Sequence, residues 1–171
     1  MSKRELAILS LLSAGLFSVA WIDGFTGVSL FVAFLPLLHI ENFYFKNKEQ
    51  YRSGAFFKWA FLTILLWNFI TTWWIKNASV AGMVIAFLVN TFQFSFILWL
   101  FHITRRKIGS SFGYFALIVY WVTYEHFYLN AEISWPWLTL GYGFAEDIRL
   151  IQWYEYPGSL GGSLWVLLVN V

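Results

Sequence analysis

The chain has 171 residues, of which 60% are hydrophobic and only 12% charged, and it contains no cysteine. Ordinary soluble domains are about 45–50% apolar and about 25% charged, and a small fold must expose a large share of its residues to water. Soluble and disordered classes are therefore excluded. The lack of cysteine excludes disulfides, thiolate metal sites and cysteine nucleophiles within these residues. The net charge of +2 is too small and scattered for a nucleic-acid-binding surface.

Several apolar runs approach the roughly 20 residues that a transmembrane helix needs. Five of them occupy residues 6–22, 28–40, 59–75, 80–103 and 112–128, and a last run, 160–171, is preceded by an expected short amphipathic helix over 148–156. The last run is too short to cross a hydrocarbon core of about 30 Å. We therefore expect an all-α, multi-pass transmembrane helix bundle of about five full spans and an incomplete sixth, in one membrane domain over residues 1–171.

The basic residues predict the orientation of the bundle, because cytoplasmic loops are enriched in lysine and arginine. With the N-terminus in the cytoplasm and one crossing per run, nine of the 11 basic residues lie inside and two outside. The inner residues are Lys3, Arg4, Lys46, Lys48, Arg52, Lys58, Arg105, Arg106 and Lys107, and the outer residues are Lys76 and Arg149. Alternatively, the first run is a signal peptide cleaved near Ser18-Val19-Ala20, which would leave the remaining orientation unchanged.

Three polar side chains, Asn68, Asn90 and Gln93, lie inside the predicted spans. Asn90 and Gln93 are three residues apart, so they share a helix face. We interpret all three as partners in hydrogen bonds between helices. The alternative is a substrate site within the membrane, because a polar side chain there is costly to desolvate.

Two histidines, His39 and His102, lie near the predicted inner boundary, where partial hydration favours an imidazole side chain. Neither has a second His, Asp or Glu at ligand spacing, so no metal site is predicted. Glu125 and His126 lie near the outer end of the fifth span, but adjacent residues do not face each other on a helix. We expect both to be hydrated at the outer interface rather than to act as a pair.

The segment Ile133–Phe144 is too apolar for an aqueous loop and too interrupted for a span. Pro136 removes a helical hydrogen bond and favours an extended Trp135, while Gly141 and Gly143 permit close backbone approach or a positive φ. Irregular backbone at membrane depth persists only where it is buried in protein or lines a cavity. We expect the segment at the outer interface, either as the rim of a lipid-access cleft or as a plain anchor.

The last third of the sequence resembles the apolipoprotein N-acyltransferase family. The resemblance is carried by Ser134-Trp135-Pro136-Trp137-Leu138-Thr139-Leu140-Gly141-Tyr142, by Ile151-Gln152-Trp153, and by the run from Gly161 to Asn170. In that family a PW…LGY stretch leads through an IQ segment into a span with a similar ending. Weaker matches at Trp73-Trp74-Ile75 and from Trp21 to Leu38 extend the resemblance over nearly the whole chain.

The resemblance implies a bacterial inner-membrane enzyme that moves an acyl chain from a phospholipid to the α-amino group of a lipoprotein's diacylglyceryl-modified N-terminal cysteine. It also implies that the chemistry lies in a nitrilase-like α/β domain outside the membrane, with a Glu–Lys–Cys triad whose cysteine carries the acyl group. This chain has no cysteine and stops at Val171. We therefore assign no catalytic residue, cofactor or metal, and expect the membrane part of a longer enzyme, inactive alone.

By position, the resemblance places Trp135, Pro136, Trp137, Gly141 and Tyr142 on the rim through which lipid substrates would reach the active site. The expected partners are membrane phospholipid, as acyl donor, and a lipoprotein acceptor, and no nucleic acid. The alternative is a non-catalytic membrane scaffold or transporter subunit. A transporter would favour paired charges within the spans, and residues 59–75 and 80–103 contain no Asp, Glu, Lys or Arg.

Overall fold

The computed structural model describes residues 1–132 and 135–171, and these residues fold into helices and turns without a β-strand. The longer helices are α1 (Lys3–Val19), α3 (Leu35–Lys46), α4 (Gly54–Thr72), α5 (Val80–Ile108), α6 (Ser110–Leu129) and α7 (Gly158–Asn170). The short elements are α2 (Leu30–Ala33) and the 3₁₀ helices η1 (Gly27–Ser29), η2 (Trp73–Asn77), η3 (Pro136–Leu138), η4 (Leu140–Phe144) and η5 (Gln152–Glu155). The predicted all-α class is confirmed for the described residues.

Three stretches of helix are long and apolar enough to cross a membrane, namely Gly27–Lys46, Gly54–Asn77 and Val80–Ile108. They correspond to the second, third and fourth predicted spans. The first, fifth and last predicted runs also fold as helices, as α1, α6 and α7. Their passage through a membrane stays a prediction.

Several helices extend beyond their apolar runs at polar ends, and α1 and α5 show the reasons. α1 begins at Lys3, because Ser2 and Glu5 form a reciprocal capping box at its first turn. α5 continues through its basic last turn to Ile108 and stops before Gly109, whose φ of 113° favours glycine. Cations in a last turn are stabilised by the helix dipole. Hydropathy therefore locates the apolar part of a helix, whereas capping and hydrogen bonding decide where the helix ends.

The second predicted span is interrupted at Phe34, between α2 and α3. An unbroken helix would pair the Phe34 amide with the Leu30 carbonyl, four residues earlier. Here the side-chain amide of Asn170 lies between them: the Phe34 N–H donates to Asn170 Oδ1 (3.1 Å), and Asn170 Nδ2 donates to the Leu30 carbonyl (2.9 Å). A side chain inserted in this way bends a helix. Pro36, in the first turn of α3, removes a further backbone donor.

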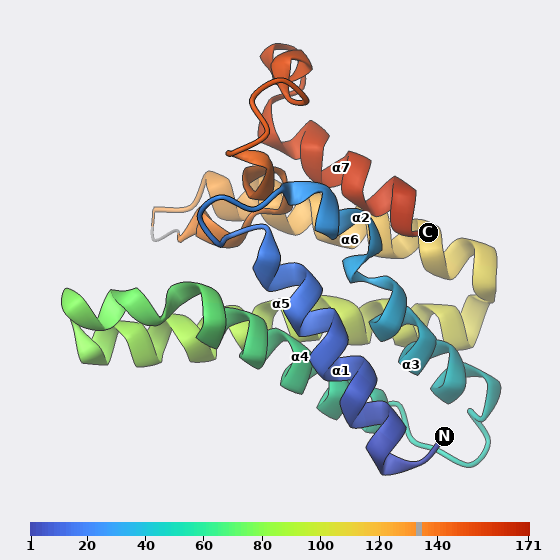
Figure 1. Cartoon of the computed structure of the whole chain (residues 1–171). Helices are drawn as coiled ribbons and strands as arrows, with labels where there is room; N and C mark the ends of the chain where they lie inside the picture. The colour runs from blue at the N-terminus through green and yellow to red at the C-terminus, as the bar shows by residue number, and fades with distance from the viewer. Residues whose placement is uncertain (133–134) are drawn as a thin grey trace.

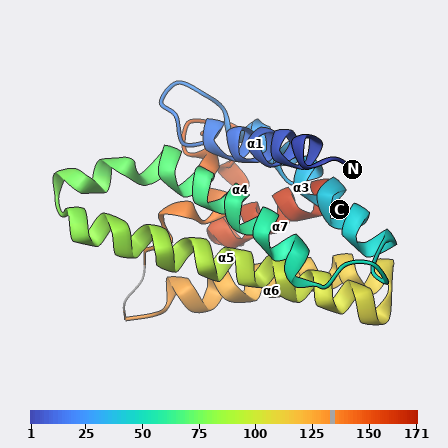
Figure 2. The same ribbon diagram turned by 90° about the horizontal axis from the view of Figure 1, so that it is seen from below.

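The bundle is built around the long antiparallel pair α4–α5. α4 packs against α5 and α1, and α5 also packs against α6, so that α4, α5 and α6 lie side by side (Figure 2). The tip of the α4–α5 pair extends past the rest of the bundle (Figure 1). α7 packs against α2, α6 and η4, so the end of the chain returns to its beginning.

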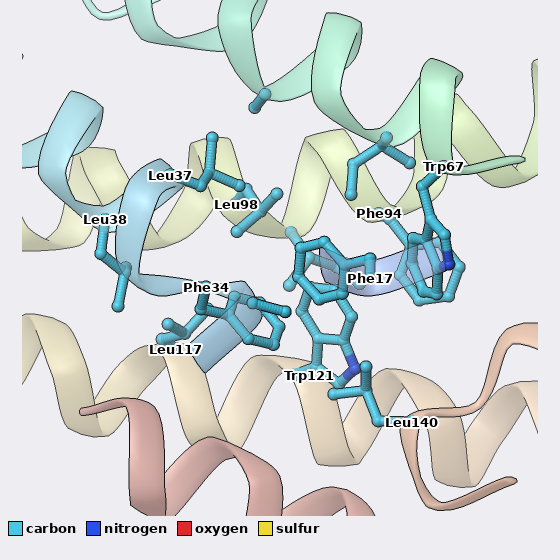
Figure 3. Packing of buried hydrophobic residues seen from close by; sticks show 14 of the residues in the cluster. Phe17, Phe34, Leu37, Leu38, Trp67, Phe94, Leu98, Leu117, Trp121 and Leu140 are labelled. Carbon is cyan, nitrogen blue, oxygen red and sulfur yellow. The ribbon is translucent and has the colours of Figure 1, made fainter. Parts of the chain in front are cut away.

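A chain of aromatic rings runs through the core and joins its helices (Figure 3). Phe17 of α1 stacks on Trp67 of α4, with 4.9 Å between ring centroids, and meets Phe34 edge-on at 4.7 Å. Trp121 of α6 also meets Phe34 edge-on, at 5.1 Å, and stacks on Phe94 of α5 at 5.0 Å. Each such pair contributes about 0.5–1.5 kcal/mol beyond simple burial. The residue at the helix break is thus a contact point for α1 and α6.

The predicted hydrogen bonds between helices are confirmed for two of the three polar residues. The Tyr128 hydroxyl donates to Asn90 Oδ1 (3.2 Å), and the Tyr124 hydroxyl donates to Gln93 Oε1 (2.9 Å), joining α6 to α5. For Asn68 the prediction is wrong, because its Nδ2 donates to the carbonyl one turn earlier in its own helix (3.0 Å).

A buried ionic cluster of Glu41, His102 and Arg105 joins α3 to α5. We expected His102 to be partly hydrated near a membrane boundary. This expectation is wrong, because the side chain is fully buried. Its Nδ1 lies 2.7 Å from Glu41 Oε1. The Arg105 guanidinium pairs with the other carboxylate oxygen of Glu41 and lies 4.6 Å from the ring centroid of Tyr114 in α6. His39, in contrast, is exposed.

We predict that Glu41→Gln destabilises the protein, because it leaves the buried Arg105 cation without its counter-charge. Loss of one partner of a buried ion pair typically costs about 3–5 kcal/mol. The measurement is the thermal midpoint of the intact protein in detergent. Glu49→Gln removes an exposed carboxylate nearby in the sequence and should leave the midpoint unchanged. Equal midpoints for the two variants would contradict a stabilising role for the cluster.

Candidate functional site

A cavity of about 790 Å³ lies between the loop after α1 and the segment that contains η3 and η4. We call it the Trp137 cavity. It is lined by Ala20, Trp21, Ile22, Asp23, Trp135, Pro136, Trp137, Gly141, Tyr142, Ala145, Glu146, Ile151, Tyr154 and Ser159. The five predicted rim residues, Trp135, Pro136, Trp137, Gly141 and Tyr142, therefore share one cavity wall. Their role as a substrate rim stays a prediction.

The wall is built from two short 3₁₀ helices rather than from extended chain. η3 begins at Pro136, and η4 follows after Thr139, whose φ of −58° and ψ of 125° separate the two. The first residues of the predicted irregular segment, Ile133 and Ser134, lie outside the described residues. From Trp135 to Phe144 the segment contains 3₁₀ helices and no α-helix, and Trp137 and Tyr142 are 45% and 42% exposed.

The backbone of this wall is held by side chains from α6, α7 and η5. The Leu140 N–H donates to Glu125 Oε1 (3.0 Å), and the Gly141 N–H donates to Ser163 Oγ (3.0 Å). The Tyr154 hydroxyl donates to the Gly141 carbonyl (3.2 Å). Burial raises the pKa of Tyr154 to about 12, so the phenol keeps its proton well above neutral pH and remains a donor. The backbone groups of Leu140 and Gly141 thereby find partners within the protein.

The expected hydration of Glu125 is wrong, because this side chain is only 1% exposed. In addition to Leu140, its Oε1 accepts a hydrogen bond from Trp121 Nε1 (2.9 Å), one turn earlier in α6. His126, the next residue, is exposed, so the two point in different directions, as predicted. No local pattern marks Glu125 as buried, since its backbone partner lies 15 residues further along the chain.

The opposite wall of the Trp137 cavity belongs to the loop after α1. The Trp21 Nε1–H donates to the carbonyl of Trp137 (2.9 Å). Asp147 accepts hydrogen bonds from the Thr26 hydroxyl (2.9 Å) and from the Gly27 N–H (2.7 Å). These bonds join residues that are 116 to 121 positions apart. They fix both sides of the cavity relative to each other.

The short amphipathic helix predicted over residues 148–156 does not form. Turns replace its beginning, with the Leu150 N–H donating to the carbonyl of Asp147 (2.8 Å), and only η5 is helical. Because the Asp147 side chain is bound to the loop after α1, tertiary contacts override the amphipathic periodicity here.

The glycines of the wall serve close approach rather than positive φ. A Cβ at Gly141 would overlap the carbonyl oxygen of Ser159 in α7, and a Cβ at Gly143 would overlap the Leu30 side chain. Neither glycine has a positive φ. Of the two alternatives predicted for these positions, close backbone approach is therefore correct.

The cavity lining is mainly apolar, with five aromatic side chains and two exposed carboxylates, Asp23 and Glu146. Trp74 of η2 extends the aromatic surface, since its ring centroid lies 5.8 Å from that of Trp135 and 5.5 Å from that of Trp137. Among residues 1–132 and 135–171, no group of three acidic or histidine side chains is placed to hold a metal ion. The arrangement suits an apolar or amphipathic ligand.

We predict that Gly141→Ala destabilises the protein by about 1–3 kcal/mol, because the new methyl group must push η4 away from the α7 backbone. The thermal midpoint of the intact protein in detergent measures the effect. Gly15→Ala is the matched control, since nothing lies within 4 Å of its added Cβ in α1. Alanine is a better helix former than glycine, so Gly15→Ala should leave the thermal midpoint unchanged or raise it. A Gly141→Ala variant as stable as the control would disprove the close fit.

Comparison with known proteins adds an independent finding. Residues 13–171 match the family described as the apolipoprotein N-acyltransferase N-terminal domain. The apolipoprotein N-acyltransferase of Chlorobaculum tepidum is 27% identical over 140 residues, which cover 82% of this chain and 25% of that relative. The chain thus spans about a quarter of the length of this curated relative. No solved structure matches the chain.

Proposed function

Because the chain belongs to the apolipoprotein N-acyltransferase N-terminal domain family, we propose that it is the membrane-embedded part of such an enzyme. The enzyme would transfer an acyl chain from a phospholipid to the N-terminal amine of a diacylglyceryl lipoprotein. These 171 residues contain no cysteine, so the acyl-carrying thiol that the family resemblance implies would come from elsewhere in the protein. In this proposal the chain alone is inactive.

We further propose that the Trp137 cavity admits the lipid substrates. The observation that carries this proposal is that the five rim residues line one cavity of about 790 Å³. Ligand cavities are typically apolar and aromatic with a few polar groups, and this description fits the three tryptophans and two carboxylates of the wall. The exposed Trp137 and Tyr142 rings provide amphipathic surface of the kind found at membrane interfaces.

The proposed orientation has the N-terminus in the cytoplasm of a bacterial inner membrane, with α1, α6 and α7 inside the bilayer beside the three longer apolar stretches. Its support is the nine-to-two distribution of basic residues. The start of α1, the end of α3 and the start of α4 meet around one cavity, and Arg106 of α5 bonds to the α3–α4 connection there. The Trp137 cavity lies beyond the other end of α1.

We predict that Trp137→Ala raises KM for the lipid substrates and leaves kcat nearly unchanged, because the residue contributes to binding and not to bond breaking. Aromatic anchors of this kind are typically worth about 10- to 30-fold in affinity. The intact protein is assayed with phospholipid and a synthetic diacylglyceryl lipopeptide, and acylation of the lipopeptide amine is followed by mass spectrometry.

Trp73→Ala is the matched control for this assay. Trp73 is 47% exposed, close to the 45% of Trp137, but it packs under Lys76 and does not line the cavity. Its kinetic constants should equal those of the unaltered protein. Equal effects of both substitutions would disprove the access role. An intact protein that acylates no lipopeptide would instead favour the alternative, a non-catalytic scaffold or transporter subunit.

The orientation is tested separately by single cysteines and a membrane-impermeant maleimide. Asp23→Cys, Asn77→Cys and Asn130→Cys should react in intact spheroplasts, whereas Lys48→Cys and Lys107→Cys should react only after permeabilisation. The unaltered protein gives the background from cysteines elsewhere. Because Asp23 follows α1 and Asn130 follows α6, failure of either one to react from outside would contradict the crossing of the preceding helix.

A further inference from the structure

A second cavity, of about 490 Å³, lies at the end of α1 opposite the Trp137 cavity. We call it the Lys58 cavity. Its walls come from the first turns of α1, the end of α3 with the connection that follows, and the first turns of α4. The residues used below are Lys3, Leu6, Tyr44, Lys58, Trp59 and Leu62. Nothing in the proposed acyl transfer uses this cavity.

The cavity is cationic. Of the described residues that line it, two are lysines, Lys3 and Lys58, and none is acidic. Both lysines are exposed, and among the described residues no carboxylate forms an ion pair with either ammonium. The carboxylate of Glu5, close by in α1, accepts a hydrogen bond from the backbone N–H of Ser2 (2.9 Å).

Two arginines at this end of the bundle are already engaged by the protein itself. Arg105 is paired with the buried Glu41. Arg106 donates to the backbone carbonyls of Tyr51 and Lys48, at 2.8 Å each. The two lysines of the cavity thus differ from these arginines in having no partner of opposite charge or carbonyl oxygen in the described structure.

Besides the lysines, the cavity lining includes the phenols of Tyr44 and Tyr51 and several apolar side chains. The Trp59 Nε1–H donates to the Tyr44 hydroxyl (2.9 Å), which leaves the proton of that hydroxyl to donate to a ligand oxygen. Tyr44 is only 5% exposed, so this donor is held in a fixed position. Leu6 and Leu62 supply aliphatic surface. In both α1 and α4 a lysine is followed three or four residues later by a leucine that lines the same cavity, so charge and aliphatic surface follow each other along each helix, as headgroup and acyl chain do in a phospholipid.

We propose that the Lys58 cavity binds an anionic phospholipid from the leaflet that faces this end of the bundle. The headgroup phosphate lies between the ammonium groups of Lys3 and Lys58, and an acyl chain runs over Leu6 and Leu62. Basic pockets between transmembrane helices on the cytoplasmic side are a recognised form of anionic-lipid site. With the proposed orientation, the leaflet is the cytoplasmic one, so the bound lipid is distinct from substrates that enter at the Trp137 cavity.

The test measures lipid binding to the intact protein in a non-ionic detergent by native mass spectrometry. Dioleoyl phosphatidylglycerol and dioleoyl phosphatidylcholine are titrated separately, since they share their acyl chains and differ in net charge. The unaltered protein should bind phosphatidylglycerol more tightly. The double variant Lys3→Gln/Lys58→Gln should weaken that binding by roughly 30-fold, because each lysine near an anionic lipid surface contributes about fivefold.

The matched control is Lys46→Gln/Lys48→Gln, which removes two positive charges at the same end of the bundle without altering the cavity lining. It should bind phosphatidylglycerol within about twofold of the unaltered protein, whereas general electrostatic attraction would weaken both variants alike. Equal losses in the two double variants would overturn the proposal. So would equal binding of the two lipids by the unaltered protein.

Inorganic phosphate distinguishes a lipid site from a simple anion site. At millimolar concentration, inorganic phosphate should fail to displace phosphatidylglycerol, because it has no acyl chain to contact Leu6 and Leu62. Displacement by inorganic phosphate would overturn the assignment to a lipid. Lipid binding is measured without acyl transfer, so the test can confirm or refute this site even if the protein has no detectable activity.

Discussion

Backbone polar groups in an apolar environment must find partners within the protein, and the rest of this structure depends on that constraint. Helices meet it automatically, but the chain leaves helical geometry at the α2–α3 break and along the wall of the Trp137 cavity. At both places the missing bonds are supplied by side chains from distant elements. The side chain of Asn170 bonds to the backbone at the break. Those of Glu125 and Ser163 accept hydrogen bonds from the backbone of the wall. Buried polar side chains here are structural supports for irregular backbone.

The two ends of α1 face cavities of opposite character. The Trp137 cavity is broad and aromatic and carries carboxylates, whereas the Lys58 cavity is smaller and cationic. Between them lies the aromatic chain of the core, which contacts α1 through Phe17 and continues to Trp121. Trp121 in turn donates to Glu125 under the cavity wall. The aromatic chain of the core is thereby linked through Glu125 to the wall of the Trp137 cavity.

The sequence predicted those features that depend on local pattern. Apolar runs located all of the longer helices, and the proline, glycine and tryptophan content of the segment after α6 indicated irregular backbone that either rims a cleft or anchors the chain at the interface. The family resemblance selected the five residues that share the wall. What local pattern missed depends on pairing at long range. Glu41 lies 61 and 64 residues from its partners His102 and Arg105, so its neighbours along the chain give no sign of burial.

The order of synthesis determines when the α2–α3 break can form. Leu30 and Phe34 leave the ribosome 140 and 136 residues before Asn170. At roughly 5–20 residues per second, that interval is on the order of 7–30 s. During it, the carbonyl of Leu30 and the amide of Phe34 have only each other as helical partners. The bend therefore forms only after α7 has been made, when Asn170 inserts its side-chain amide between the Leu30 carbonyl and the Phe34 amide.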